Sequence, residues 1–286
     1  MESLVSTEWL ADALERPDIA VMDASRHLPD AGRDGAAEYA ASHIPGARFF
    51  DLSKLVDQTS AVPMACPRTD QLSKLLQELG VSTADKIIFY DDSAVKTSAR
   101  AWFLCRENGF DNVAILDGGL AKWKAEGRQL ESGAVAHKAV SAPALAAQGR
   151  IRIKADMLAN IDERCEQVLD ARDAGRFGGS AVDTVHNLPT GHIPGSTNLP
   201  FTQLFRDNGT YKSPDELRDL FEQARIDLSL PVTTTCGSGV TASVLLFALH
   251  LIGHDDTALY DGSWLEWGAD PATPKAVFNH SNGRAS

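Results

Sequence analysis

The stretch TTTCGSGVTA, residues 233–242, places a cysteine between a β-branched run and the apolar run VLLFALHLIG. The residues before Cys236 favour a buried strand and those from Thr241 onward favour a helix, so the thiol follows a strand and precedes a helix. Open α/β sheets bind ligands at this end of their strands. Gly237 and Gly239 allow the backbone to curl so that successive N–H groups point inward. The stretch therefore predicts an α/β fold with an anion-holding loop around Cys236.

The thiol of Cys236 allows three interpretations. As a nucleophile it must ionise, and a helix N-terminus favours the thiolate over a free thiol with a pKa of about 8.5. It could instead be a buried cysteine in an ordinary strand-to-helix turn. A thiol phosphatase is the third interpretation, but such enzymes clamp the phosphate dianion with an arginine. The residues after Cys236, GSGVTASV, contain neither Arg nor Lys, which disfavours a phosphatase.

The sequence contains an internal repeat, with two similar copies about 147 residues apart. The matching pairs are IAVMDAS (19–25) with QVLDAR (167–172), ASHIPGARFFDL (41–52) with TGHIPGSTNLPF (190–201), and ILDGGLAKW (115–123) with LYDGSWLEW (259–267). At the position of Cys236 the first copy has Asp91, and a cysteine chosen only for packing would not usually align with an aspartate. We expect two similar domains, only one of which carries the thiol.

Each copy alternates short apolar runs with longer helical patterns. The strand-like runs are IAVMDA, KIIFYDD and NVAILDG in the first copy and QVLDA, PVTTTC and TALYDG in the second. TDQLSKLLQELG has apolar residues at helical spacing and ends at Gly80, while Ser213 and Glu216 form a capping box with Pro214 at the first helical position. This alternation predicts an α/β fold of two tandem domains, each a parallel sheet with helices on both faces.

Domain boundaries follow from the repeat and from an Ala/Gly/Ser-rich stretch between the copies. We expect a non-catalytic N-terminal domain over 1–132, a linker over 133–149, a catalytic C-terminal domain over 150–275 and a loose tail over 276–286.

Composition narrows the class of protein. The net charge of -12 over 286 residues argues against nucleic acid or an anionic membrane as the main partner. No run approaches 18 apolar residues, and the start MESLVSTEWL lacks the pattern of a secretory signal, so we expect a cytoplasmic location. The four cysteines form no CxxC pair and no zinc-like cluster, so we expect no metal site and no disulfide.

Taken together, these stretches resemble the tandem-domain rhodanese family of sulfurtransferases, and most closely its members that use 3-mercaptopyruvate. The stretches that carry the resemblance are MDAS, GRD, SHIPGARFFD, LDGGLAKW, LDARDAGRF, GHIPGSTNLPF, CGSGVTA and YDGSWLEW. The resemblance implies no cofactor. It implies that Cys236 takes sulfur from a small-molecule donor as a persulfide, that pyruvate leaves, and that a thiol, thioredoxin or cyanide accepts the sulfur.

The resemblance also implies roles for individual residues. Cys236 and Ser238 would be catalytic, and the substrate-binding residues would be Arg176, Gly237, Gly239, Val240, Thr241 and His186. Arg176, in LDARDAGRF, matches an arginine that binds the substrate carboxylate, although it could instead form a surface salt bridge. Where the family has a second such arginine this chain has Val185, with His186 beside it. An aspartate and a histidine proposed to help Ser238 move a proton are replaced by Ser53 and Met64.

Two alternatives to a mercaptopyruvate enzyme stay open. Because Val185 replaces an arginine, thiosulfate could be the preferred donor. Because Ser53 and Met64 replace the proton-moving pair, the chain could be a persulfide carrier with little turnover of small molecules. Other recurring residues are expected to have structural roles: His43 and His192 in turns and packing, and Trp123 and Trp267 in packing.

Overall fold

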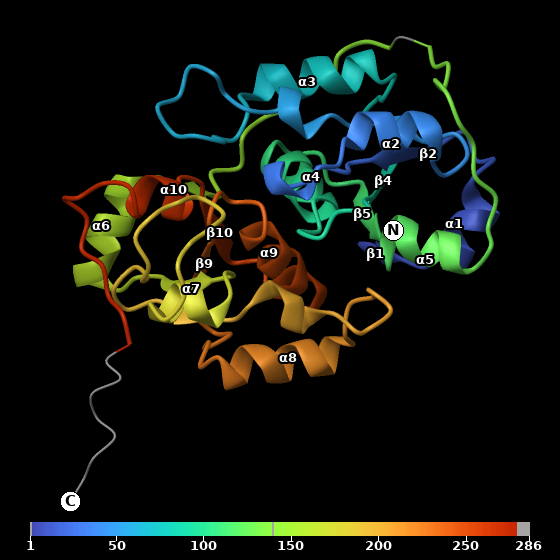
Figure 1. Cartoon of the computed structure of the whole chain (residues 1–286). Coiled ribbons are helices and arrows are strands. Elements are labelled where there is room, and N and C mark those ends of the chain that lie inside the picture. The colour runs from blue at the N-terminus through green and yellow to red at the C-terminus, as the bar shows by residue number, and fades with distance from the viewer. Residues whose placement is uncertain (1, 139, 279–286) are drawn as a thin grey trace, which may run out of the picture. The chain divides into compact units, whose positions relative to one another are not determined.

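The computed structural model describes residues 2–138 and 140–278. The chain divides into two compact units (Figure 1). The first holds the chain up to Arg150 without Ser60–Met64, together with Phe205–Ser213. The second holds Ile151–Leu204, the chain from Pro214 onward, and Ser60–Met64.

The first unit is built on a five-stranded sheet whose paired strands are all parallel. In sheet order the strands are β1 (Leu4–Val5), β5 (Val113–Leu116), β4 (Lys86–Tyr90), β2 (Ile19–Asp23) and β3 (Arg48–Phe49). The helices are α1 (Thr7–Ala13), α2 (Gly35–Ala41), α3 (Thr69–Glu78), α4 (Ser98–Glu107) and α5 (Gly119–Ala125), with 3-10 turns at Pro29–Ala31 and Leu52–Lys54.

The second unit repeats this order. Its parallel sheet runs β6 (Ile151–Arg152), β10 (Thr257–Tyr260), β9 (Val232–Thr235), β7 (Gln167–Asp170) and β8 (Thr197–Asn198). The helices are α6 (Lys154–Glu163), α7 (Ala174–Gly178), α8 (Pro214–Gln223), α9 (Ala242–Leu251) and α10 (Ser263–Trp267), with a 3-10 turn at Phe201–Leu204. The strand-like runs of the sequence all became strands, and the repeat predicted the shared topology correctly.

Helices cover both faces of each sheet because the strands are apolar on both sides. In the first unit one core cluster joins Ile88 to Leu10 of α1 and Trp123 of α5, while α4 packs on β4 and β5. In the second unit a cluster joins Tyr260 to Met157 of α6, while α9 packs on β9 and β10. Every residue of β9 is buried, and its threonine-rich sequence suits a central strand.

Two helix ends that the sequence predicts are confirmed. Helix α8 begins at Pro214, where a fixed φ and a missing N–H cost nothing. Helix α3 ends just before Gly80, whose φ of 67° is the left-handed conformation that glycine adopts without strain.

The expected linker and tail are more ordered than their composition suggests. The linker packs back on the first unit, where the Ala146 N–H donates to Asn108 and the Gln148 N–H to Glu107. In the expected tail, Ala276 exchanges two backbone hydrogen bonds with His192, so this part of the tail is paired rather than loose. The expected tail from 279 onward lies outside the described residues.

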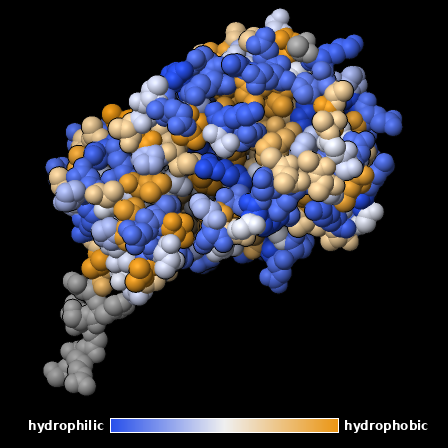
Figure 2. Space-filling model, turned by 45° about the horizontal axis from the view of Figure 1, so that its top comes forward, coloured by the Kyte–Doolittle hydropathy of each residue, from blue (hydrophilic) through white to orange (hydrophobic). Residues whose placement is uncertain are grey.

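The distribution of polar and apolar residues on the surface is in keeping with the charged composition of the sequence. On the face drawn in Figure 2, hydrophilic residues are interspersed with hydrophobic ones. Within the part of the chain that the structure describes, none of the helices has the length and apolar character that crossing a bilayer requires.

Candidate active site

The cysteine loop connects the central strand of the second sheet to α9. Cys236 follows β9 directly, and its side chain is buried, with 2% of the residue exposed. The Gly239 N–H donates to the Cys236 Sγ over 3.1 Å. Gly239 has a φ of 77°, which turns this N–H inward and which a residue with a side chain would rarely adopt. The loop therefore directs a backbone donor at the sulfur, as the sequence predicts.

Helix α10 holds the outer side of this loop. The Trp264 N–H donates to the Cys236 carbonyl over 3.0 Å, and the Leu265 N–H donates to the Gly237 carbonyl over 2.8 Å. The Cys236 N–H donates to the Ser263 hydroxyl over 3.2 Å, and that hydroxyl donates to the Tyr260 carbonyl. Because the N–H groups of Trp264 and Leu265 donate to carbonyls of the loop, α10 stabilises the conformation of the loop around the sulfur.

The sequence analysis missed Ser263. The sequence gives little indication of a role for Ser263, since its counterpart in the first copy is a glycine in ILDGGLAKW. Both residues have a positive φ, 48° at Ser263 and 57° at Gly119. A serine at a position that favours glycine has a reason here, because its hydroxyl accepts the Cys236 N–H.

Arg176 lies on α7 and is held by two carboxylates. The Arg176 Nε donates to Asp173, the N-cap of the helix, and the Arg176 Nη1 lies 3.5 Å from the Asp183 Oδ1. Its side chain is 20% exposed, so the guanidinium is partly accessible to a ligand. Arg176 therefore forms salt bridges, and it also keeps an accessible part that could bind a carboxylate.

His186 lies against the cysteine loop. A β-carbon added at Gly237 would be 2.2 Å from the His186 Cε1, so the imidazole packs directly on the glycine backbone. The His186 Nδ1 lies 3.4 Å from the Asp183 Oδ2. Desolvation by burial lowers the pKa of His186 from its usual value, and Asp183 opposes that shift. The structure thus places His186 against the cysteine loop and connects it to Arg176 through Asp183.

Asp183 was not anticipated from the sequence. Its carboxylate is buried and accepts the backbone N–H groups of Val185 and His186. Burial alone would raise the pKa of Asp183, but the His186 N–H and the charges of His186 and Arg176 hold it below its usual value. An Asp three residues before a His was the available signal.

Arg172 has a structural role, unlike Arg176. It is 1% exposed, its Nη2 donates to the Asp170 Oδ2 over 2.6 Å and to the Gly191 carbonyl, and its guanidinium lies 4.3 Å from the ring centroid of Trp264. The buried Arg172 guanidinium, with these partners, stabilises the loop before α7 and packs on Trp264 of α10.

The remaining predicted site residues fall in two groups. Ser238, Val240 and Thr241 belong to the cysteine loop, two to five residues after Cys236, and are partly exposed. Ser53 belongs to the first unit, where its hydroxyl donates to the Asp51 Oδ1 over 2.5 Å. Val185 belongs to the second unit and is 38% exposed. Among the described residues no group of three His, Cys, Asp or Glu side chains could hold a metal ion.

The first unit repeats the loop with a carboxylate in place of the thiol. Asp91 follows β4, the central strand, and its two carboxylate oxygens accept the N–H groups of Ser93 and Ser98, each over 2.8 Å. The Leu120 N–H donates to the Asp91 carbonyl just as the Trp264 N–H donates to that of Cys236. The loop amides of the first unit are therefore satisfied internally, by a group that cannot accept sulfur.

The counterpart of Arg176 in the first unit is Glu38. His43 stacks on Tyr39 and its Nδ1 contacts the Tyr39 carbonyl, in the same way as His192 with Phe177. Tyr39 therefore corresponds to Phe177. The residue before each ring is Glu38 in one unit and Arg176 in the other, which reverses the charge.

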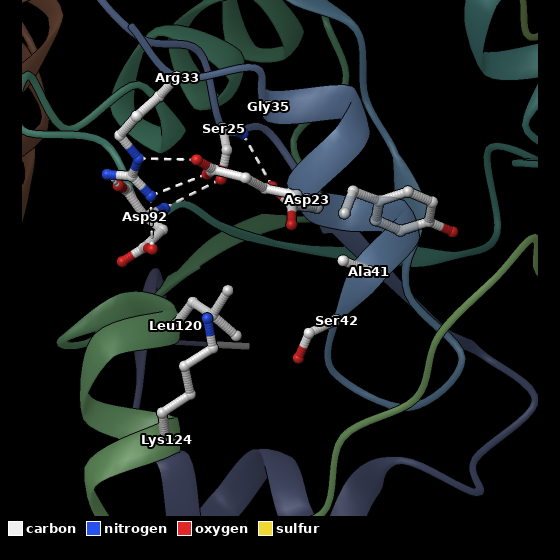
Figure 3. Close-up of a pocket in the computed structure, with 11 residues that line it drawn as sticks. Asp23, Ser25, Arg33, Gly35, Ala41, Ser42, Asp92, Leu120 and Lys124 are labelled. Carbon is white, nitrogen blue, oxygen red and sulfur yellow. Dashed lines mark hydrogen bonds and ion pairs between the residues drawn. The ribbon is translucent and has the colours of Figure 1, made fainter. Parts of the chain in front are cut away.

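A cavity of about 190 Å³ is lined by Glu38 and by Arg33 and Asp92, and Figure 3 labels the last two. Arg33 bridges Glu38 and Asp92 at its wall, with N–H···O distances of 2.8 Å to each carboxylate. Glu38 and Asp92 are thus paired with Arg33 within the unit, and none of the described residues that line the cavity is a cysteine.

Comparison with known proteins places the chain in a family. The profile of the rhodanese-like domain matches twice, over residues 6–126 and 154–270. The 3-mercaptopyruvate sulfurtransferase of Mus musculus is 38% identical over 99% of this chain and 97% of its own length. That of Escherichia coli strain K12 is 38% identical over 94% of this chain and 96% of its own length.

A solved structure agrees with this match. The crystal structure of SseA from Escherichia coli, described as showing the rhodanese fold of 3-mercaptopyruvate sulfotransferases, superimposes with a TM-score of 0.81. It is 36% identical and covers 92% of this chain and 99% of that one. The thiosulfate sulfurtransferase of Gallus gallus is also similar, at 34% identity over 93% of both chains. With two matching domains and relatives along nearly its whole length, the chain belongs to the rhodanese family.

Proposed function

We propose that this chain is a sulfurtransferase that takes sulfur from 3-mercaptopyruvate as a persulfide on Cys236. The observation that carries the proposal is the loop around Cys236, in which the Gly239 N–H is aimed at Sγ and α10 holds the loop carbonyls. Such a loop stabilises a negatively charged sulfur, both before attack and as the persulfide. The relatives named for this donor support the choice.

The reaction breaks one bond and makes one. The Cys236 thiolate attacks the donor sulfur, the carbon–sulfur bond breaks, and its electron pair leaves with pyruvate as the enolate, which then takes up a proton. The loop formed by Gly237, Ser238, Gly239, Val240 and Thr241 would hold the sulfur, with the Gly239 N–H donating to Sγ. Arg176 would bind the donor carboxylate through its guanidinium, and His186, which packs on the loop at Gly237, would contact the donor.

The acceptor and the first unit complete the proposal. A thiol acceptor such as thioredoxin would remove the outer sulfur and return Cys236 to the thiolate. The first unit would be non-catalytic, because Asp91 fills its loop and Glu38 would repel an anionic donor. A cytoplasmic location stays a prediction.

Thiosulfate is the second candidate donor. Val185 gives the site one arginine fewer for holding a carboxylate, which favours thiosulfate, because that donor requires no carboxylate recognition. The absence of Arg and Lys from the loop sequence GSGVTA disfavours a dianion.

The test is intact mass after brief exposure to each donor. We expect a gain of about 32 Da, one sulfur atom, that maps to Cys236 and is removed by a thiol. Cys236→Ser should lose the gain, while the matched control Cys165→Ser, an exposed cysteine of the same unit, should keep it. No gain with either donor, or a gain that survives Cys236→Ser, would overturn the proposal.

A further inference from the structure

Asp183 connects two side chains of the candidate site. Its side chain is 0% exposed, its Oδ1 accepts the N–H groups of Val185 and His186 over 3.1 Å each, and the same oxygen lies 3.5 Å from the Arg176 Nη1. The other oxygen, Oδ2, faces the His186 Nδ1 at 3.4 Å. One buried carboxylate therefore sets the orientation of both Arg176 and His186.

The arrangement leaves the second nitrogen of His186 available. Because a carboxylate lies beside Nδ1, the favoured neutral tautomer carries its hydrogen there and leaves a lone pair on Nε2. Within residues 2–138 and 140–278, Nε2 makes no hydrogen bond. The charged groups that face the ring are Asp183, Arg176 and Arg172, and desolvation by burial lowers the pKa of His186, so the imidazole is neutral at neutral pH. It is therefore able to accept a proton beside the cysteine loop.

Sulfur transfer from mercaptopyruvate creates a need for such a group. The donor thiol carries a proton, and the leaving pyruvate enolate must gain one. A base that takes the proton from the donor sulfur and gives it to the enolate carbon balances the step without any co-reactant. Thiosulfate carries no such proton, and sulfite leaves with its own electron pair, so loading from thiosulfate needs no proton carrier.

We propose that His186 carries this proton and that Asp183 is the positioning residue that holds it against Gly237. The inference rests on the proposed function, because it takes Cys236 as the site of sulfur loading. It makes His186 the residue that distinguishes a protonated donor from an unprotonated one.

The test is single-turnover loading of sulfur on Cys236 at saturating donor, followed by intact mass. His186→Asn should slow loading from mercaptopyruvate by about 100-fold or more, the usual contribution of a general acid–base group. It should slow loading from thiosulfate by no more than about threefold, within ordinary context effects on such a step. The matched control is His250→Asn, which removes another Asp-paired histidine of the same unit, at the far end of α9.

The outcomes separate the inference from the proposed function. Equal slowing with both donors would make His186 structural and would overturn the inference. A loss that disappears at saturating mercaptopyruvate would mean that His186 only binds the carboxylate, and would overturn it as well. Failure of the wild-type protein to load Cys236 with either donor would instead overturn the proposed function.

A second variant and a second readout keep the test independent of folding. Asp183→Asn should reduce mercaptopyruvate loading in the same donor-selective way as His186→Asn, because the ring loses its partner. In His186→Ala, added imidazole should restore part of the mercaptopyruvate rate but leave the thiosulfate rate unchanged. In the wild type, the ratio of mercaptopyruvate to thiosulfate loading should fall as the pH falls through the pKa of His186, since the imidazolium cannot accept a proton. A ratio independent of pH and no rescue by imidazole would contradict the inference.

Discussion

Asp91 and Cys236 occupy one position in two sheets, since each is the first residue after the central strand and each accepts a backbone N–H of its own turn through its side chain. In the first unit the acceptor is a carboxylate oxygen, and in the second it is sulfur. The same turn therefore exists twice, and only one of the two copies carries a thiol at this position.

Installing a thiol in the first unit should not create a second sulfur site. We expect Asp91→Cys in a Cys236→Ser background to gain no sulfur from mercaptopyruvate, because Glu38 stands where Arg176 would bind the donor. Intact mass of the double variant, beside Cys236→Ser alone, checks this. A gain of about 32 Da mapped to residue 91 would show that the loop alone is sufficient.

Arg176 should matter for binding the donor. We expect Arg176→Ala to raise the KM for mercaptopyruvate by about 10- to 100-fold, the loss of one hydrogen bond to a charged group. Steady-state kinetics at fixed acceptor concentration measures the change. An unchanged KM would leave Arg176 as a salt-bridge residue of α7 and nothing more.

Arg172 should matter for stability. We expect Arg172→Met to lower the free energy of unfolding by about 3–5 kcal/mol, because it leaves the buried carboxylate of Asp170 unpaired. Denaturant unfolding followed by fluorescence measures the loss. The exposed pair of Arg16 and Asp18 supplies the control, and Arg16→Met should lower the free energy of unfolding much less than Arg172→Met does. Similar losses for the two variants would contradict the structural role of Arg172.

Gly237 should not tolerate a side chain. In Gly237→Ala the new methyl group would lie 2.2 Å from the His186 Cε1, so the ring must move away from the loop. We expect mercaptopyruvate turnover to fall at least tenfold, since a displacement of about 1 Å can cost that much or more in rate. The control is Gly195→Ala, where a β-carbon would meet no atom within 4 Å and only the positive φ is strained. Equal activity of the two variants would contradict the close packing of His186.

The pH dependence of stability should report on His186. Its pKa in the folded protein lies below the value of 6.5 expected in the unfolded chain, because burial disfavours the charged ring. The unfolded state therefore binds the proton more readily, and the free energy of unfolding falls as the pH falls through 6.5. The Tm of the wild type should drop more steeply between pH 7 and pH 5.5 than that of His186→Asn. Parallel curves for the two proteins would show that His186 titrates alike in both states.

Much of the fold was readable from local patterns. Apolar runs of four or five residues became the central strands, because only a parallel sheet covered on both faces buries such runs completely. Pro214 and Gly80 marked helix ends because their backbone restrictions act over a single residue. The packing of the linker on Glu107 and Asn108 was not readable, since it combines backbone hydrogen bonds with a bond from the Gly149 N–H to the distant Glu107 carboxylate.

The candidate site divides in the same way. The sequence by itself determined that a thiol lies at the end of a strand, directly before a turn that contains Gly237 and Gly239, because strand, turn and helix signals are all local there. Only the tertiary structure decided that Asp183 joins Arg176 to His186, that His186 packs on Gly237, and that Ser263 caps the Cys236 N–H. The first contact lies within an irregular segment, and the other two join segments far apart in the chain that the pairing of β7, β9 and β10 brings together, so no local pattern encodes them.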